Sequence, residues 1–284
     1  MAEISAENVK ALREKTGAGI MECKNALKEC DGDFGKAEKY LKEKGLAAVE
    51  KRSSRATNEG KVFVKIKSDG SCCAMVELSS ETDFVARNPD FIALGEALTE
   101  RVLEKAYTEP NDELNGMVSD LAAKIRENMS LKRVKTLNAS STEYLTSYIH
   151  GEGAIGVVVK MAADKAGAFN EEAKEFAFSL ALHVAAFSPT ALDQSKVDAA
   201  WLKEQEDIFR KQMEQDEKLQ GKPANMIDNI LKGKVSKFLK DICLMDQAYV
   251  KDEKMTVAAA LKDVSKRLGA ELSIVDYVYF KVGG

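Results

Sequence analysis

The sequence predicts an α+β protein with a helical module at the N-terminus, two related α/β core subdomains, and an antiparallel helical hairpin inserted into the second of them. Three observations support this prediction. Apolar residues recur at helical spacing up to Gly45, and they alternate with polar residues between Val62 and Leu78. Two long amphipathic patterns then flank a Gly-Lys-Pro turn within residues 195–240. Because a period of 3.6 indicates a helix and a period of two a half-buried strand, this chain must contain both.

Residues 1–54 are expected to form a module of three short helices. Ser5 can cap the first helix, which Thr-Gly-Ala-Gly interrupts, and a second apolar stripe follows before an Asp-Gly-Asp turn. The third stripe begins at Phe34 and is expected to end at Gly45. The charged stretch from Glu50 to Gly60 has no apolar face, so it is expected to be a linker.

Residues 55–140 are expected to form the first core subdomain. The stretches Val62–Ile66 and Cys72–Leu78 alternate in polarity around a Ser-Asp-Gly-Ser turn, which predicts a β-hairpin. A polar loop follows. Asn88 and Pro89 then supply an N-cap and a first-turn proline for a helix, and a second helical pattern runs from Leu114 to Met129.

Residues 141–190 and 241–284 are expected to form the second core subdomain. Strand-like stretches lie at about 144–150 and 155–161, and a helix is expected from about Asn170 to Phe187. This order of strands and helix resembles that of the first subdomain. Two related α/β halves are therefore compatible with the sequence, which does not by itself prove a repeat.

The inserted helical hairpin is expected at residues 191–240. Its two patterns begin near Val197 and Ile227 and are amphipathic, which is typical of antiparallel helices that pack on each other. A final helix, from about Thr256 to Leu268 and stopped by Gly269, should precede the apolar strand SIVDYVYFKV. The sequence leaves open whether the hairpin mediates a homodimer, packs on its own core or contacts a partner.

Charge and composition exclude several classes of function. The 42 Lys and Arg nearly balance the 46 Asp and Glu, so the basic excess typical of proteins that bind nucleic acid directly is missing. The N-terminal stretch is charged, and no apolar run approaches the roughly 20 residues that span a bilayer. We therefore expect a cytoplasmic protein with a protein partner and no contact with a membrane.

Residues that could carry catalysis are few, and we expect neither an enzyme nor a cofactor or metal site. The five cysteines include no CxxC pair, and Cys72 and Cys73 are expected to be structural. Of the two histidines, His183 lies in an apolar helix and should be packed. His150 ends a strand before Gly-Glu-Gly, where a structural role and a site role are equally supported.

The loop after the first hairpin, within SSETDFVARNPDF, is the exception. It places an acid, an aromatic residue and a valine in a polar segment between a strand and a capped helix. In one interpretation, Phe84 and Val85 tuck under the hairpin while Thr82 or Asp83 makes a turn, and physical arguments alone slightly favour it. In the other, Phe84 is presented as an anchor for a partner's pocket.

Two long motifs decide between these interpretations. The run LREKTGAGIMECKNAL and the run AMVELSSETDFVARN, supported by KGLAAVEKR, IRENMSLKRV and YIHGEGAIGVVV, closely resemble the elongation factor Ts family over essentially the whole chain. The resemblance implies an N-terminal module like a ubiquitin-associated domain, two related core subdomains and an inserted hairpin. It also implies the partner elongation factor Tu, bound both with GDP and without nucleotide.

The resemblance further implies which residues contact this partner. Asp83 and Phe84, flanked by Thr82 and Val85, are expected to insert into its GTPase domain beside the magnesium and phosphate site and so to promote GDP release. Further contacts are expected at the positions Lys24, Ile125 and His150.

The chain also departs from the family pattern. Arg126 replaces a glycine that the family commonly has, and Ala248 and Tyr249 lie where the family often has Gly-Gln-Pro-Phe-Val. A peptide-binding adaptor or chaperone is the alternative function, and a thiol enzyme, which would need a cysteine of low pKa, is a third.

Overall fold

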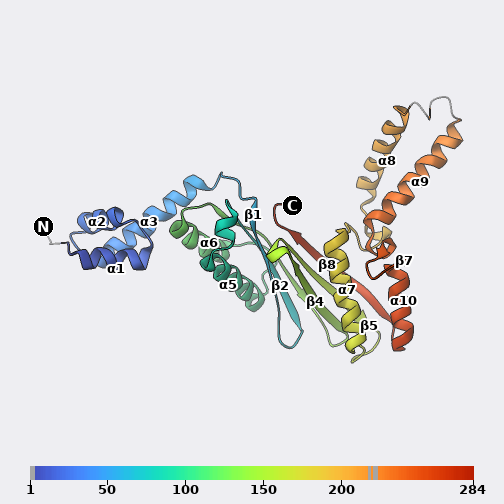
Figure 1. Ribbon diagram of the computed structural model, residues 1–284, viewed down its shortest axis with the longest axis horizontal. Helices are drawn as coiled ribbons and strands as arrows, with labels where there is room; N and C mark the ends of the chain where they lie inside the picture. Colours follow the sequence, from blue (N-terminus) through green and yellow to red (C-terminus); the bar gives the residue numbers. More distant parts are fainter. Residues whose placement is uncertain (1–3, 217–218, 220–222) are drawn as a thin grey trace. The chain divides into compact units, whose positions relative to one another are not determined.

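The computed structural model describes residues 4–216, 219 and 223–284, coloured along the chain in Figure 1. The chain divides into two compact units. The first comprises the chain up to Asn138 together with Ile149–Gly156 and Phe280–Gly284, and the second comprises Ala139–Tyr148 and Val157–Tyr279. Helices and small sheets are mixed, as expected for an α+β protein. Within the described residues, no helix is both long and apolar enough to cross a bilayer.

Three helices form the N-terminal module: α1 (Ala6–Thr16), α2 (Ile20–Glu29) and α3 (Phe34–Arg52). Ser5 caps α1 as predicted, because its side chain accepts a hydrogen bond from the Asn8 amide at 3.1 Å. The apolar faces of the helices meet in a small core. It consists of Val9, Leu12, Cys23, Ala26, Leu27, Ala37 and Leu41.

The prediction that the third helix ends at Gly45 is wrong. Helix α3 continues to Arg52 and packs against α6 (Asp112–Ile125). A Cβ atom on Gly45 would lie 3.1 Å from the Cβ of Ala123, so glycine here permits the close approach of two helices. The predicted linker also shortens, because its last residues, Glu59 and Gly60, begin a strand.

A three-stranded antiparallel sheet follows, in the order β1-β2-β3. Its strands are β1 (Glu59–Ile66), β2 (Cys72–Ser80) and β3 (Met129–Asn138). Helices α5 (Pro89–Lys105) and α6 pack on this sheet, and Asn88 caps α5 as predicted. Met129, expected on the second helix, lies instead in β3, because α6 ends at Ile125 with the next residue in the left-handed conformation.

A second three-stranded sheet has the order β4-β5-β8. Its strands are β4 (Glu143–His150), β5 (Ile155–Ala163) and β8 (Leu272–Lys281). The predicted helices are present as α7 (Glu171–Phe187), which Asn170 caps, and α10 (Val257–Leu268), which Gly269 ends in the left-handed conformation. Helix α7 buries an apolar stripe of Phe176, Leu180 and Val184.

The helical hairpin consists of α8 (Ala199–Glu214) and α9 (Ala224–Ile242), which lie side by side in Figure 1. Trp201 at the start of α8 contacts Phe238 near the end of α9, with ring centroids 5.7 Å apart, so the helices are antiparallel as predicted. Of the predicted Gly-Lys-Pro turn, Gly221 and Lys222 lie outside the described residues. A short ribbon of β6 (Ala248–Tyr249) and β7 (Asp252–Thr256) follows.

Candidate functional site

The loop between β2 and α5 contains a single helical turn, α4 (Asp83–Ala86), and the name TDFV loop is used below for Thr82–Val85. The Thr82 hydroxyl caps this turn by accepting a hydrogen bond from the Val85 amide at 3.3 Å. Val85 is 7% exposed, whereas Phe84 is 80% exposed, more than any other large apolar side chain in the described part of the chain. The first interpretation of the loop is therefore right for Val85, which tucks in, and wrong for Phe84, which is exposed. That Phe84 anchors a partner stays a prediction.

The geometry of a helical turn explains why these neighbours differ. Consecutive residues of a helix point about 100° apart, so Val85 and Ala86 can face the core only if Phe84 faces away. Leaving a phenylalanine in water forgoes about 1.5–3 kcal/mol of burial free energy. Asp83, beside it, pairs with Arg87 at 3.3 Å in an exposed ion pair. The turn thus presents an aromatic ring and a carboxylate outward.

The base of the TDFV loop is held by a residue that is distant in sequence. The Glu127 carboxylate accepts hydrogen bonds from the Thr82 hydroxyl at 2.9 and 3.1 Å and from the Thr82 amide at 3.2 Å. The Thr82 carbonyl in turn accepts from the Ser80 hydroxyl at 2.9 Å. Hydrogen bonds to a charged acceptor are the stronger kind, so Thr82 is fixed from both sides.

Asn128, the next residue, ties the same loop to the segment that leaves the three-helix module. Its amide donates to Glu81 Oε1 at 2.6 Å, and its side-chain nitrogen donates to the carbonyls of Ser53 and Arg55 at 3.2 and 2.7 Å. Glu127 and Asn128 were not predicted from the sequence. The signal that could have found them is an acid followed by an amide at the junction of a helix and a strand, because neither side chain continues the apolar pattern of either element.

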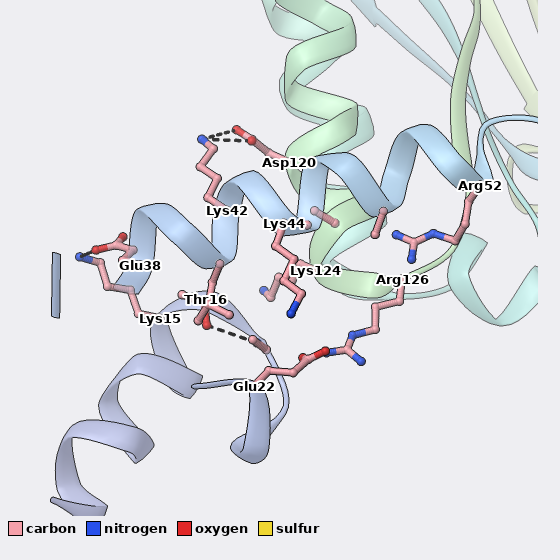
Figure 2. A pocket seen from close by; sticks show the side chains of 15 residues that line it. Lys15, Thr16, Glu22, Glu38, Lys42, Lys44, Arg52, Asp120, Lys124 and Arg126 are labelled. Atoms are coloured by element: carbon pink, nitrogen blue, oxygen red, sulfur yellow. Dashed lines mark hydrogen bonds and ion pairs between the residues drawn. The ribbon is translucent and has the colours of Figure 1, made fainter. Parts of the chain in front are cut away.

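Arg126 connects the core to the three-helix module. It adopts φ 70° at the C-terminal cap of α6, a left-handed conformation in which glycine is unstrained. This conformation accounts for the glycine that the resemblance implies at this position. Its guanidinium pairs with Glu22 of α2, as Figure 2 shows. The Gly19 amide donates to Glu22 at 2.9 Å, and this bond, followed by Arg126, lowers the pKa of the Glu22 carboxyl.

A cavity of about 370 Å³ lies beside this pair, between the module and α6. Figure 2 shows the Lys44 and Lys124 side chains among those that line it. At its edge, the ion pair of Lys42 with Asp120 at 3.1 Å joins α3 to α6. Polar contacts and the close approach of Gly45 therefore attach the module to the core.

The remaining residues predicted to bind a partner all belong to the first unit. Lys24 is exposed on α2, which also exposes Ile20 and Met21 at 55% and 65%. Ile125 is half-buried, packs against the core and ends α6. His150 is exposed at the end of β4, before the 3₁₀ turn η1 (Gly151–Gly153).

Strand β1 and the segment 125–128 bring several of these residues into one region. Glu59 of β1 pairs with Ser80, just before the TDFV loop, and Lys61 of β1 donates to the Glu152 carbonyl of η1. The His150 turn and the TDFV loop therefore flank the same strand. Ile125 directly precedes the residues that bond to α2 and to Thr82. Lys24 lies on α2 itself, two residues after Glu22.

Two cysteines and the buried histidine lie in environments that disfavour their charged forms. Burial raises the pKa of Cys73 to about 12 and also raises that of Cys243, the opposite of a reactive thiolate. His183 is fully buried, as predicted. Its Nδ1 accepts from the Val250 amide at 3.2 Å and its Nε2 contacts Gln247 Oε1 at 2.9 Å, and burial lowers its pKa. Its hydrogen bonds are those of a neutral, structural imidazole.

Comparison with known proteins agrees with the two sequence motifs. The profile of the family described as Elongation factor TS matches residues 81–284. An elongation factor Ts of Treponema denticola is 47% identical over 99% of this chain and 99% of the relative. Those of Treponema pallidum and Clostridium acetobutylicum are 44% and 39% identical over 99% of this chain, and over 99% and 92% of the relatives. The chain therefore belongs to the elongation factor Ts family.

Proposed function

We propose that this protein is a guanine-nucleotide exchange factor for elongation factor Tu in translation, and that the TDFV loop promotes GDP release. Family membership supports the exchange role. The observation that supports the role of the loop is Phe84, which is 80% exposed on a turn whose base is bonded to Glu127. Interface energy concentrates in a few large side chains that fill partner pockets, and a firmly held exposed aromatic suits that task.

The proposed mechanism requires no covalent chemistry. In a GTPase, Mg²⁺ links the nucleotide phosphates to the protein and offsets their charge. Insertion of Phe84 and Asp83 beside the partner's magnesium site would displace groups that hold the metal, so GDP would dissociate faster. The exposed Asp83–Arg87 pair opens at little cost, because exposed ion pairs contribute about 0–1 kcal/mol.

The burial of the four loop residues suggests a division of roles among them. Phe84 and Asp83 face outward and are the contact residues of the proposal. Val85 is buried and Thr82 is bonded to Glu127, so these two support the turn. Lys24 and His150 are exposed on elements that border the same region and are proposed as further contacts.

Fluorescent GDP bound to elongation factor Tu provides the direct test. With excess unlabelled GDP present, an amount of this protein well below that of the partner should accelerate loss of the fluorescent nucleotide from the whole population. Phe84→Ala should remove most of this acceleration, although the variant remains folded. Unchanged exchange by folded Phe84→Ala would refute the role of the loop, and no acceleration by the wild type would refute the exchange function.

Binding experiments separate this function from that of a peptide-binding adaptor. If the protein weakens GDP binding, GDP must weaken its binding to elongation factor Tu by the same factor. An adaptor should bind the nucleotide-free and GDP-bound partner equally and should tolerate the loss of Phe84. Affinity for the two forms, measured by calorimetry, distinguishes the two functions.

A further inference from the structure

We propose that Glu127 is a positioning residue that sets the direction in which Phe84 is presented. The inference rests on the proposed exchange function and extends it to a side chain 45 positions away from Thr82 in sequence. The Glu127 carboxylate accepts from both the hydroxyl and the amide of Thr82, which is the N-cap of α4. The cap thus has its side chain and its backbone bound to one acceptor.

The turn itself is too short to hold Phe84 in place. A single turn fixes several backbone dihedrals for few hydrogen bonds, so it is unfavourable without tertiary contacts. Val85 and Ala86 supply the only buried apolar side chains of α4. Contacts at the cap must therefore contribute much of the order of this turn, and Glu127 provides the charged acceptor there.

Glu127 is itself held in place by its neighbours in sequence. On one side, Arg126 is in the left-handed conformation that ends α6, with its amide bonded to the Ala122 carbonyl at 2.9 Å. On the other side, the Asn128 amide is bonded to Glu81 at 2.6 Å. The carboxylate therefore projects from backbone that is fixed at both ends. It can direct Thr82, and through Thr82 the one-turn helix that bears Phe84.

Four single variants and one double variant test this role, by the maximal rate of GDP release and by the concentration of this protein that gives half of that rate. Glu127→Ala should lower the maximal rate about tenfold, because it removes a charged acceptor shared by two donors. The half-saturating concentration should change by less than about threefold, because the other docking surfaces remain. Glu127→Gln keeps one acceptor oxygen and should restore most of the rate.

Thr82 provides the second half of the test. Thr82→Val removes the hydroxyl with little change of shape and should lower the maximal rate, whereas Thr82→Ser should retain it. In the double variant Glu127→Ala with Thr82→Val, the added loss from Thr82→Val should be smaller than its loss in the wild-type background. The bond between the two side chains is then already missing, and Thr82→Val removes only the cap bond from the Val85 amide. Additive losses would show that the two residues act separately and would overturn the proposal.

Controls distinguish failure of this inference from failure of the proposed function. Glu104→Ala removes an acid of the same type from an exposed pair with Arg101 near the end of α5 and should leave the exchange rate unchanged. If Phe84→Ala lowers exchange but Glu127→Ala does not, the positioning role is wrong and the exchange function stands. If neither lowers exchange, the loop mechanism is wrong. Equal urea midpoints of Glu127→Ala and Glu127→Gln, together with a rate difference, would exclude a purely structural role.

Discussion

Two loops of this protein follow the same plan and treat their phenylalanine in opposite ways. In each sheet the central strand, β2 or β5, is followed by a loop and by a helix whose cap is an asparagine, Asn88 or Asn170. In the first loop, Phe84 is 80% exposed. In the second, the Phe169 ring stacks on Tyr144 with centroids 5.2 Å apart. The plan of strand, loop and capped helix therefore does not determine where an aromatic side chain points.

The difference lies in what each loop uses to reach its core. The first loop uses Val85, and the adjacent Phe84 then has to point outward while Glu127 holds the cap. The second loop has Ala168 buried and Phe169 half-buried, and its start is tied to the residue before β8, because the Asp164 amide donates to the Glu271 carbonyl at 3.0 Å. The second loop packs its own aromatic ring on Tyr144. The first loop leaves its aromatic ring exposed.

The largest expected effect is on nucleotide exchange. Phe84→Ala should slow catalysed GDP release about thirtyfold, the loss typical of a truncated interface hot spot of about 2 kcal/mol. Phe169→Ala, the matched control in the second loop, should leave the rate per folded molecule unchanged. Stopped-flow release of fluorescent GDP from elongation factor Tu measures both. Equal losses for the two variants would mean that the comparison of the loops says nothing about function.

Sequence patterns predict what is decided locally. Caps at Ser5 and Asn88 were predicted correctly because their chemistry involves neighbours three or fewer residues away. The end of α3 was predicted wrongly because Gly45 serves a contact with Ala123, which no local pattern contains.

The direction of Phe84 was beyond prediction from physical arguments for the same reason. Its support comes from Glu127, which is remote in sequence, and the composition of the loop fits either a tucked or an exposed ring equally well. Likewise, Met129 continued the helical period of α6, and only the left-handed backbone of Arg126 moves it into a strand. Resemblance to the family identified the loop as a contact candidate, and the structure adds how it is supported.

The second expected effect is on stability, and here Phe169→Ala should have a larger effect than Phe84→Ala. Phe169→Ala should lower the free energy of unfolding by about 2 kcal/mol, through lost burial and the lost ring pair with Tyr144. Phe84→Ala should change it by less than about 0.5 kcal/mol, as is usual for an exposed residue. Urea denaturation followed by circular dichroism measures both. A large destabilisation by Phe84→Ala would show that its ring packs on the protein in solution.

The third effect should separate the two units by pH. Burial lowers the pKa of His183 in the second unit below its ordinary value of 6.5, so the unfolded chain takes up the proton first. The contribution of neutral, buried His183 to the free energy of unfolding is complete above pH 6.5 and is lost as the pH falls towards the lowered pKa. Its size is about 1.4 kcal/mol for each unit by which the pKa differs between the folded and unfolded chain. After correction for the pH dependence of intrinsic exchange, the protection of α7 amides from hydrogen exchange should fall between pH 7 and 5 more than that of α5 amides. In His183→Gln this difference should disappear, and its persistence would assign the pH response to another group.

The smallest effect is expected from Arg126→Gly, which tests whether the module or the cap directs Phe84. Glycine relieves the strain of the left-handed backbone at φ 70° but loses the exposed pair with Glu22, so the free energy of unfolding should change by less than about 0.5 kcal/mol. Proteolysis between Ser53 and Asn58 should become faster, because one attachment of the module is gone. Exchange activity should nevertheless remain, since the bonds from Thr82 to Glu127 are intact.

Arg126→Lys keeps the charge and the strained backbone and serves as the matched control. If Arg126→Gly instead lowered the maximal rate as much as Glu127→Ala, docking of the module would be shown to direct the TDFV loop. The first loop would then depend on the whole N-terminal module, whereas the second loop depends on its own contacts.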